Sequence, residues 1–127
     1  MEQPFRAGIF AVNGQYVVLL TSHCKNCGQG FFPRRQHCLK CGAATRETES
    51  GPAGRLFSFT TVYMPTLHFK PPYSVGLIEL GDSLRVFSQI AKQPDREFTV
   101  GMEMEARPRI LWSGDGLAVS GFEFVPV

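Results

Sequence analysis

The sequence predicts a mostly β protein, and three observations support this fold class. The 127-residue chain contains 13 glycines and 9 prolines, more than a helical bundle tolerates. Its apolar residues, rich in Phe and Val, form short runs separated by turn signals. Four cysteines fall in two close pairs near the front of the chain. We therefore expect one modest core with a small metal-stapled appendage ahead of it.

The first expected element is a β-hairpin. The apolar runs Ile9–Val12 and Gln15–Leu20 are separated by Asn13-Gly14, the strongest two-residue hairpin signal. The second run leads toward Cys24. We expect this hairpin to carry the chain into the first cysteine pair.

The sequence contains no candidate membrane or export segment. No apolar run reaches the length of about 18 residues that a spanning helix needs, and Met1–Pro4 lacks the charged-then-apolar layout of a signal peptide. We expect a cytoplasmic protein that does not enter membranes. In that reducing compartment, close cysteine pairs serve as metal ligands more often than as disulfides.

The two cysteine pairs share one pattern, Cys-x-x-Cys-Gly. Two intervening residues let both sulfurs of a pair face one ion, and the following Gly can adopt the positive φ of a tight turn. Backbone N–H groups in such turns can donate to the sulfurs. Every cysteine is used, so no thiol is left for a nucleophile and the site is closed and structural. The predicted ligands of one zinc ion are Cys24, Cys27, Cys38 and Cys41.

Two alternatives at this site stay open at the level of sequence. A rubredoxin-like iron site uses four cysteines at a similar spacing and would give the chain an electron-transfer role. His23 and His37 each precede a ligand cysteine, but four cysteines are already correctly spaced, so we interpret both histidines as exposed neighbours. His68 has no spaced cysteine or nearby carboxylate in the sequence, and we expect it to be non-catalytic.

The cysteine-bearing segment is basic. It has no carboxylate between residues 23 and 46, whereas the formal net charge of the whole chain is only +2. The segment can attract an anion or an acidic partner, but the chain lacks the excess charge of a general nucleic-acid binder. Within it, Phe31–Arg35 has two interpretations. Its phenylalanines cover the barrel while its arginines are solvated, or the arginines bind a phosphate or carboxylate.

The barrel domain is expected to follow a polar connector. Glu47–Gly54 contains Ser, Gly and Pro and indicates no regular element. Leu56–Tyr63 is β-branched and aromatic and predicts a strand, and Met64–Pro72 predicts a loop. We place the boundary between residues 1–50, the hairpin and ribbon, and residues 51–127, the barrel domain.

The next two strands form a predicted antiparallel hairpin. Tyr73–Leu80 and Leu84–Ile90 are apolar and β-branched, and Gly81-Asp82-Ser83 between them indicates a tight turn. Ala91–Thr99 is polar and contains Pro94, so at most a short turn of helix fits there.

The last two strands complete the domain. Met102, Met104 and Ala106 alternate with charged residues, which predicts a strand with one wet face. Ser113–Gly116 indicates another hairpin turn before the final strand, Leu117–Val125. Five strands suit a closed, five-stranded OB-fold barrel, because closure removes the exposed edges of so few strands. A small open sandwich is the alternative.

These segments together resemble a known family. The pattern Cys-x-x-Cys-Gly, then Phe-Pro-Arg-x-x-x-Cys-x-x-Cys-Gly, then Gly54–Val62, resembles the zinc-ribbon/OB-fold proteins first described as domain of unknown function 35. Pro71–Leu80 looks like the family's second barrel strand, and Val100-Gly101-Met102 resembles its entry to the fourth. The family is also called the acyl-CoA-associated OB-fold proteins. Many members begin with helices, whereas this chain offers a hairpin.

The resemblance implies a partner. Members assemble with thiolase-like enzymes, or related synthases and aldolases, which make or break carbon–carbon bonds in acyl-CoA thioesters. The resemblance therefore implies a zinc-binding subunit that is not an enzyme on its own, stabilises the catalytic chain, and contributes to acyl-CoA binding. The residues expected to contact CoA or the partner are Arg34, Arg35, Lys40 and Lys70.

The alternative function is single-stranded nucleic-acid binding, because OB barrels and zinc ribbons both serve it. The aromatic platform would then consist of Phe57, Phe59, Tyr63 and Phe87. We rank this second, since the barrel half is slightly acidic and aromatic residues in strands more often pack in a core.

Overall fold

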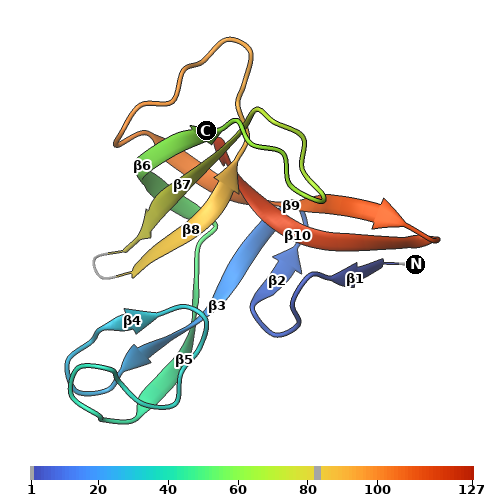
Figure 1. Ribbon diagram of the computed structural model, residues 1–127. Coiled ribbons are helices and arrows are strands. Elements are labelled where there is room, and N and C mark those ends of the chain that lie inside the picture. Colours follow the sequence, from blue (N-terminus) through green and yellow to red (C-terminus); the bar gives the residue numbers. More distant parts are fainter. Residues whose placement is uncertain (1, 82–83) are drawn as a thin grey trace.

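The computed structural model describes residues 2–81 and 84–127, which form ten strands. Among these residues no helix has the length and apolar character needed to cross a membrane. Two sheets share the strands: β2–β5 form one, and β1 with β6–β10 forms the other (Figure 1). The strands are β1 (Glu2–Pro4), β2 (Phe10–Asn13), β3 (Tyr16–Cys24), β4 (Gly30–Phe31), β5 (Thr45–Ser50), β6 (Ala53–Val62), β7 (Tyr73–Leu80), β8 (Leu84–Ile90), β9 (Glu103–Gly114) and β10 (Leu117–Pro126).

Strands β6–β10 close into the predicted five-stranded OB barrel. Antiparallel pairing runs from β8 through β7 and β6 to β9 and then to β10. A parallel contact between β10 and β8, at Phe124 and Ile90, completes the ring. Closure pairs the two strands that an open sheet would leave as edges. The mostly β prediction is confirmed.

The barrel hairpins lie where their turn residues predict. β7 and β8 are antiparallel, with Leu80 opposite Leu84. Of the predicted turn Gly81-Asp82-Ser83, residues 82 and 83 lie outside the described part of the chain. Between β9 and β10 the turn residues Asp115 and Gly116 have φ values of 53° and 75°. Two consecutive positive φ values are typical of a type I′ hairpin turn, whose twist matches that of the flanking strands.

The N-terminal hairpin is confirmed, and it joins the barrel core. Asn13 pairs with Tyr16, so the turn is centred one residue later than Asn13-Gly14, on Gly14-Gln15, with Gly14 at φ 66°. The inward side chains of this region, Ile9, Val17 and Leu19, belong to the same buried cluster as the barrel side chains Leu56, Ile78, Met104 and Phe124. The division at residue 50 stays a prediction.

The prediction that Glu47–Gly54 is an irregular connector is wrong. Thr45–Ser50 is strand β5, antiparallel to β3, and β6 already begins at Ala53. Apolar burial does not explain β5. Instead, the Thr21 hydroxyl lies 2.7 Å from the Thr48 hydroxyl and 2.9 Å from that of Ser50. This polar cluster stabilises a strand that no hydrophobic pattern reveals. Strand β1 was also not predicted, and it pairs in parallel with β10.

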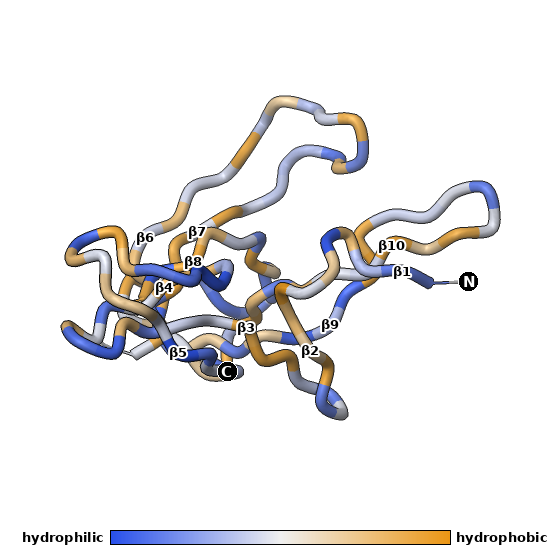
Figure 2. Tube along the Cα trace, turned by 90° about the horizontal axis from the view of Figure 1, so that it is seen from below, coloured by the Kyte–Doolittle hydropathy of each residue, from blue (hydrophilic) through white to orange (hydrophobic). Residues whose placement is uncertain are grey.

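The connection between β6 and β7 is the long loop predicted at Met64–Pro72. In Figure 2 it leaves the barrel as an arch and returns to it. Three large side chains at its start and middle are strongly exposed: Tyr63 at 75%, Met64 at 76% and Leu67 at 91%. The arch thus presents apolar surface away from the core.

Gly76 in β7 lies close to the neighbouring strand β6 and supports a stability prediction. A Cβ there would lie 2.8 Å from the Ser58 backbone oxygen and 3.0 Å from Leu56 Cδ1. We expect Gly76→Ala to lower the free energy of unfolding by about 1–3 kcal/mol through overpacking. Gly114→Ala is the matched control, because no atom lies within 4 Å of its added Cβ. It should stay within about 1 kcal/mol of wild type in urea denaturation. Equal stability of the two variants would contradict close packing at Gly76.

Candidate metal centre

The two cysteine pairs form two copies of one turn. In the first, the Gly28 N–H donates to the Cys24 carbonyl at 3.1 Å, and in the second the Gly42 N–H donates to the Cys38 carbonyl at 3.0 Å. Both glycines have the predicted positive φ, 78° and 77°. The Lys25 N–H donates to the Ala44 carbonyl at 3.1 Å and joins the two turns. The repeated Cys-x-x-Cys-Gly pattern therefore encodes repeated geometry.

The four thiols converge on one point. All four Sγ atoms lie within 4.8 Å of one another, with Cys24 Sγ 3.4 Å from Cys41 Sγ and Cys27 Sγ 3.7 Å from Cys38 Sγ. Sulfurs around a tetrahedral zinc ion with Zn–S bonds of about 2.3 Å are about 3.8 Å apart. The donor set and its spacing fit one four-coordinate ion with no position left for water. Cys24 and Cys38 are buried, whereas Cys27 and Cys41 are exposed.

Backbone N–H groups prepare two of the thiols as thiolates. The N–H groups of Cys27 and Asn26, each 3.4 Å from Cys24 Sγ, lower the pKa of Cys24 to about 6. The N–H groups of Cys41 and Lys40 likewise lower the pKa of Cys38. For Cys27 the Gln29 N–H lowers the pKa, but hydrogen bonds from the neighbouring sulfurs and burial outweigh it, and the pKa rises to about 11. A cation is the natural counterpart of such crowded sulfurs.

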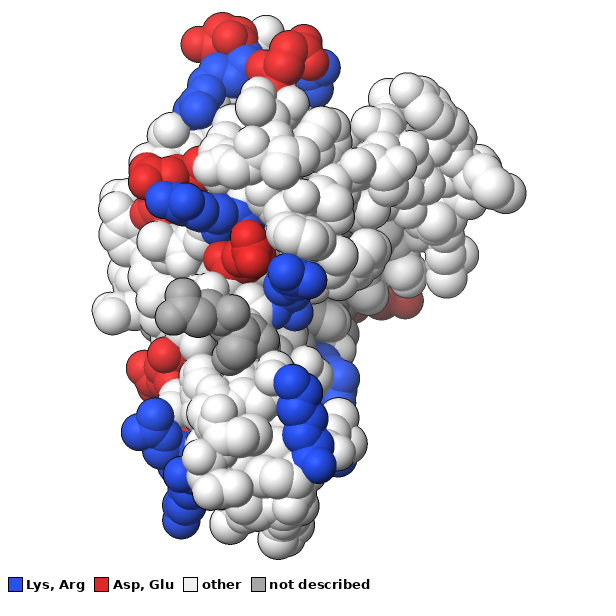
Figure 3. Space-filling view, turned by 90° about the vertical axis from the view of Figure 1, so that its left-hand side faces the viewer, with Lys and Arg blue, Asp and Glu red and all other residues white. Residues whose placement is uncertain are grey.

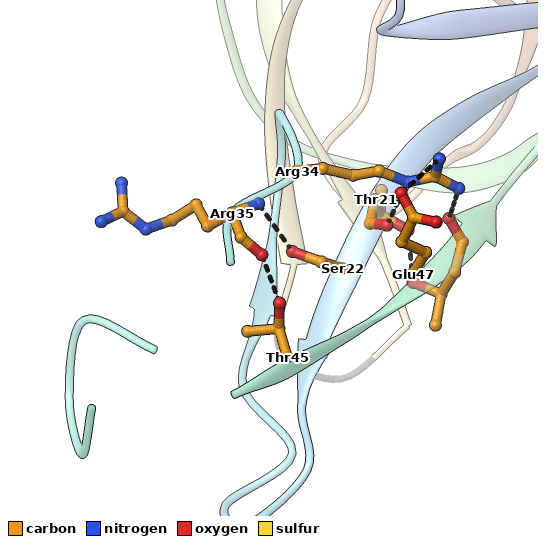
Figure 4. Close-up of polar contacts among 7 residues, drawn as sticks. Thr21, Ser22, Arg34, Arg35, Thr45 and Glu47 are labelled. Carbon is orange, nitrogen blue, oxygen red and sulfur yellow. Dashed lines mark hydrogen bonds and ion pairs between the residues drawn. The ribbon is translucent and has the colours of Figure 1, made fainter. Parts of the chain in front are cut away.

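The half-buried Arg34 side chain connects two strands of the ribbon (Figure 4). Its Nε donates to the Thr21 carbonyl and its Nη2 to the Thr48 carbonyl, both at 2.8 Å, so one guanidinium bridges β3 and β5. Nη1 lies 3.4 Å from Glu47 Oε2. Next to it, the Arg35 N–H donates to Ser22 Oγ at 3.0 Å, and the Thr45 hydroxyl donates to the Arg35 carbonyl. The Phe-Pro-Arg-Arg segment is thereby fixed to both strands.

The residues predicted to contact CoA or a partner do not form one cluster. Arg34 makes the internal contacts above, which show a structural role. Arg35 and Lys40 are exposed on the ribbon, and the Arg35 guanidinium lies 6.0 Å from the Phe31 ring centre. Lys70 is exposed on the β6–β7 arch, which belongs to the barrel and lies above β4 and β5 in Figure 1. The contact role of all four stays a prediction.

The three histidines lie outside the cysteine cluster. His23 Nδ1 lies 2.8 Å from Thr48 Oγ1, and His37 is exposed beside the second cysteine pair. Within the described residues the metal-competent cluster consists of the four cysteines, without either histidine. His68 stacks on Trp112, with ring centres 3.9 Å apart and planes 4° from parallel. Sequence reasoning missed this stack because the two residues are far apart along the chain.

Charge is distributed unevenly over the surface. In Figure 3, Lys and Arg side chains flank the ribbon at the bottom of the view with an uncharged surface between them, and most acidic side chains on this face lie over the barrel above.

One barrel carboxyl group, that of Glu123, has a shifted pKa. Burial raises the pKa of Glu123, which the nearby Arg109 guanidinium, 3.2 Å away, partly opposes.

A closed five-stranded barrel connected by β3 and β5 to a four-cysteine ribbon defines a ribbon-plus-OB-fold class of protein. Comparison with known families and proteins agrees with this class. The family model described as "ChsH2, C-terminal OB-fold domain" matches residues 47–109. A DUF35 domain-containing scaffold protein of Methanocaldococcus jannaschii is 32% identical, covering 86% of this chain and 82% of that protein. The chain belongs to the DUF35 family.

Two further similar proteins have names that mention an enzyme. The benzoylsuccinyl-CoA thiolase subunit BbsA of Thauera aromatica is 30% identical, covering 88% of this chain and 78% of that subunit. A solved structure, the Ltp2-ChsH2(DUF35) aldolase, superposes with a TM-score of 0.67 over 85% of this chain and 84% of its own. At 21% identity, the second similarity shows a shared fold.

Because Arg34 bridges two strands and Arg35 does not, we predict that substituting these adjacent arginines affects the free energy of unfolding differently. Arg34→Lys retains the charge but not the fork that reaches two carbonyl groups, so it should lower the free energy of unfolding by about 1–2 kcal/mol. Arg35→Lys, whose side chain is exposed, should change it by less than about 0.5 kcal/mol. Urea denaturation of both variants measures the difference. A larger loss for Arg35→Lys than for Arg34→Lys would contradict the assigned roles.

Proposed function

We propose that this chain is a non-catalytic, zinc-binding subunit of a thiolase-type complex that acts on acyl-CoA. The observation that carries the proposal is its similarity, over most of both chains, to DUF35 scaffold proteins and to a subunit of a named CoA thiolase. Such a subunit stabilises the catalytic chain and contributes to acyl-CoA binding. We expect the complex to work in the cytoplasm.

The distribution of cysteines supports assigning the chemistry to the partner. Carbon–carbon bond formation through a thioester needs an activated nucleophile, commonly a thiolate beside a base. The sequence has four cysteines, and all four belong to the metal cluster. A thiolate that coordinates a structural metal is not available as a nucleophile. The nucleophile therefore belongs to the thiolase-like chain.

The ribbon is the proposed docking surface. Arg35 and Lys40 are exposed on it, close to the metal cluster that holds the loops in place. CoA carries several phosphate charges, and guanidinium and ammonium groups are suited to bind them. Arg34 and Lys70 were also predicted to be contacts, but the Arg34 guanidinium is bound to β3 and β5 and Lys70 lies on the β6–β7 arch, so the proposed docking surface consists of Arg35 and Lys40. Either the phosphates of CoA or an acidic surface of the partner would complement this charge.

The proposed metal is zinc, and one substitution tests the ligand set. Purified wild-type protein should contain about one equivalent of zinc by mass spectrometry and be colourless. Cys38→Ser removes a buried ligand and should weaken zinc binding by more than the roughly 10–100-fold that loss of an outer-shell partner costs. His37→Ala, at the adjacent exposed position, should leave affinity unchanged. A red protein with iron would favour electron transfer instead.

The docking surface is tested by charge reversal. A thiolase-like partner co-purified with the untagged chain should bind the Arg35→Glu, Lys40→Glu double variant at least about tenfold more weakly, because like charges now face each other. The control with the same charge change is Arg6→Glu, Lys92→Glu, at exposed positions off the ribbon. It should bind as wild type does.

Two results would contradict the subunit proposal. One is a thiolase-like protein that turns over acyl-CoA normally by itself and binds no copy of this chain. The other is salt-sensitive affinity for single-stranded oligonucleotides without affinity for such a protein. The expectation that the four aromatic residues of the alternative platform pack in the core is wrong. They are exposed at 38% to 75%, which makes the oligonucleotide assay worth performing: Phe57, Phe59, Tyr63 and Phe87.

A further inference from the structure

A second candidate site lies on the barrel and involves none of the cysteines. It is a cavity of about 240 Å³ whose walls consist almost entirely of carbon. Phe122 and Leu111 line it, together with the more exposed Phe5 and Phe87. Phe69 and Trp112 complete the apolar wall. Aromatic rings thus converge here from β8, β9 and β10, from the segment after β1, and from the β6–β7 arch.

Four of the five rings that line this aromatic cavity, all except Phe87, contact neighbouring rings. Trp112 stacks on His68 on one side and meets the edge of Phe69 at 6.0 Å and 79°. Phe69 in turn packs on Tyr73 at 5.8 Å. Phe5 contacts the buried Phe122 at 6.2 Å. Such contacts restrict Trp112, Phe69, Phe5 and Phe122 before any ligand arrives, which lowers the ordering cost of binding.

The position of the cavity agrees with how OB barrels bind ligands. In this fold the second and third strands and the loops joining strands 1–2 and 4–5 form the usual binding face. Here those elements are β7, β8, the β6–β7 arch and the β9–β10 hairpin. Phe69 comes from the arch and Phe87 from β8, and Trp112 lies in β9 shortly before the turn that leads to β10. The cavity therefore lies on the face where this fold places aromatic side chains against a ligand.

Size and polarity restrict the ligand. Sites for whole drug-sized molecules measure about 300–1,000 Å³, so a cavity of about 240 Å³ accommodates a single ring with a short substituent. The polar residues of the lining are Ser88 and Gln89, both uncharged, so an ionised group placed against these walls would lose hydration without gaining a charged partner. Planar faces favour a planar ring, through stacked or edge-to-face contacts. The geometry points to a binding site for an uncharged aromatic ring, of the size of a phenyl group, carried by a small molecule. This site does not depend on the proposed metal or on the proposed complex.

The sole tryptophan, Trp112, provides a direct readout. Benzyl alcohol is the probe, and benzoate and benzylammonium are charged probes with the same ring. Benzyl alcohol should change Trp112 fluorescence saturably, and both charged probes should bind at least about tenfold more weakly. Adenosine monophosphate and a short single-stranded oligonucleotide test whether the ring is instead a nucleobase.

Two exposed aromatic residues supply matched variants. Phe87→Ala removes a cavity wall that is 68% exposed, so the fold should survive, and benzyl alcohol should bind about fivefold more weakly. Tyr63→Ala, at 75% exposure and outside this cavity, should bind within about twofold of wild type. Thermal unfolding of both variants verifies the fold.

Three results would overturn the inference. They are a fluorescence change that rises linearly with benzyl alcohol without saturating, equal affinity of wild type and the folded Phe87→Ala variant, and tighter binding of adenosine monophosphate or the oligonucleotide than of benzyl alcohol. The last result would identify the surface as a nucleotide platform.

Discussion

Strand β3 is the physical link on which the rest of the structure depends. Val17 and Leu19, near its start, are fully buried in the core that also contains the barrel side chains. Its last residue, Cys24, is a member of the metal-competent cluster. A shift of one residue in its pairing would turn Val17 and Leu19 toward solvent and move the cysteine away from the other thiols. The hydrophobic core thus sets the position of the first cysteine of the metal-competent cluster.

The middle of β3 explains how a polar ribbon can continue from an apolar core. Thr21 and Ser22 are both fully buried, yet they make hydrogen bonds to Thr48, Ser50 and the Arg35 N–H. Arg34 bridges β3 and β5 at the same level. Buried polar groups need such partners, and here the partners come from two different segments. The ribbon therefore depends on hydrogen bonds near the barrel and on cysteine geometry farther out.

The parts of the fold that local patterns encode could be predicted, and the parts that depend on distant partners could not. The Cys-x-x-Cys-Gly turns, the Asn13-Gly14 region and the alternation at Met104 carry local signals, and each one appears in the structure. β5 was missed because hydroxyl groups facing Thr21 stabilise it and no apolar period marks it. The aromatic cavity was missed because its rings come from segments that meet only after the barrel closes. For the same reason, the internal role of Arg34 could not be distinguished from ligand binding.

The central claim is that the metal keeps the ribbon in the shape that the partner recognises, while the barrel folds through its own core. The direct measurement is the affinity of the thiolase-like partner for the metal-loaded chain and for the same chain after chelation, with Trp112 fluorescence reporting on the barrel. The account predicts that chelation abolishes partner binding while the Trp112 signal stays unchanged, because the indole packs against the β6–β7 arch and away from the cysteines. Undiminished affinity for the partner after complete removal of the metal would contradict it.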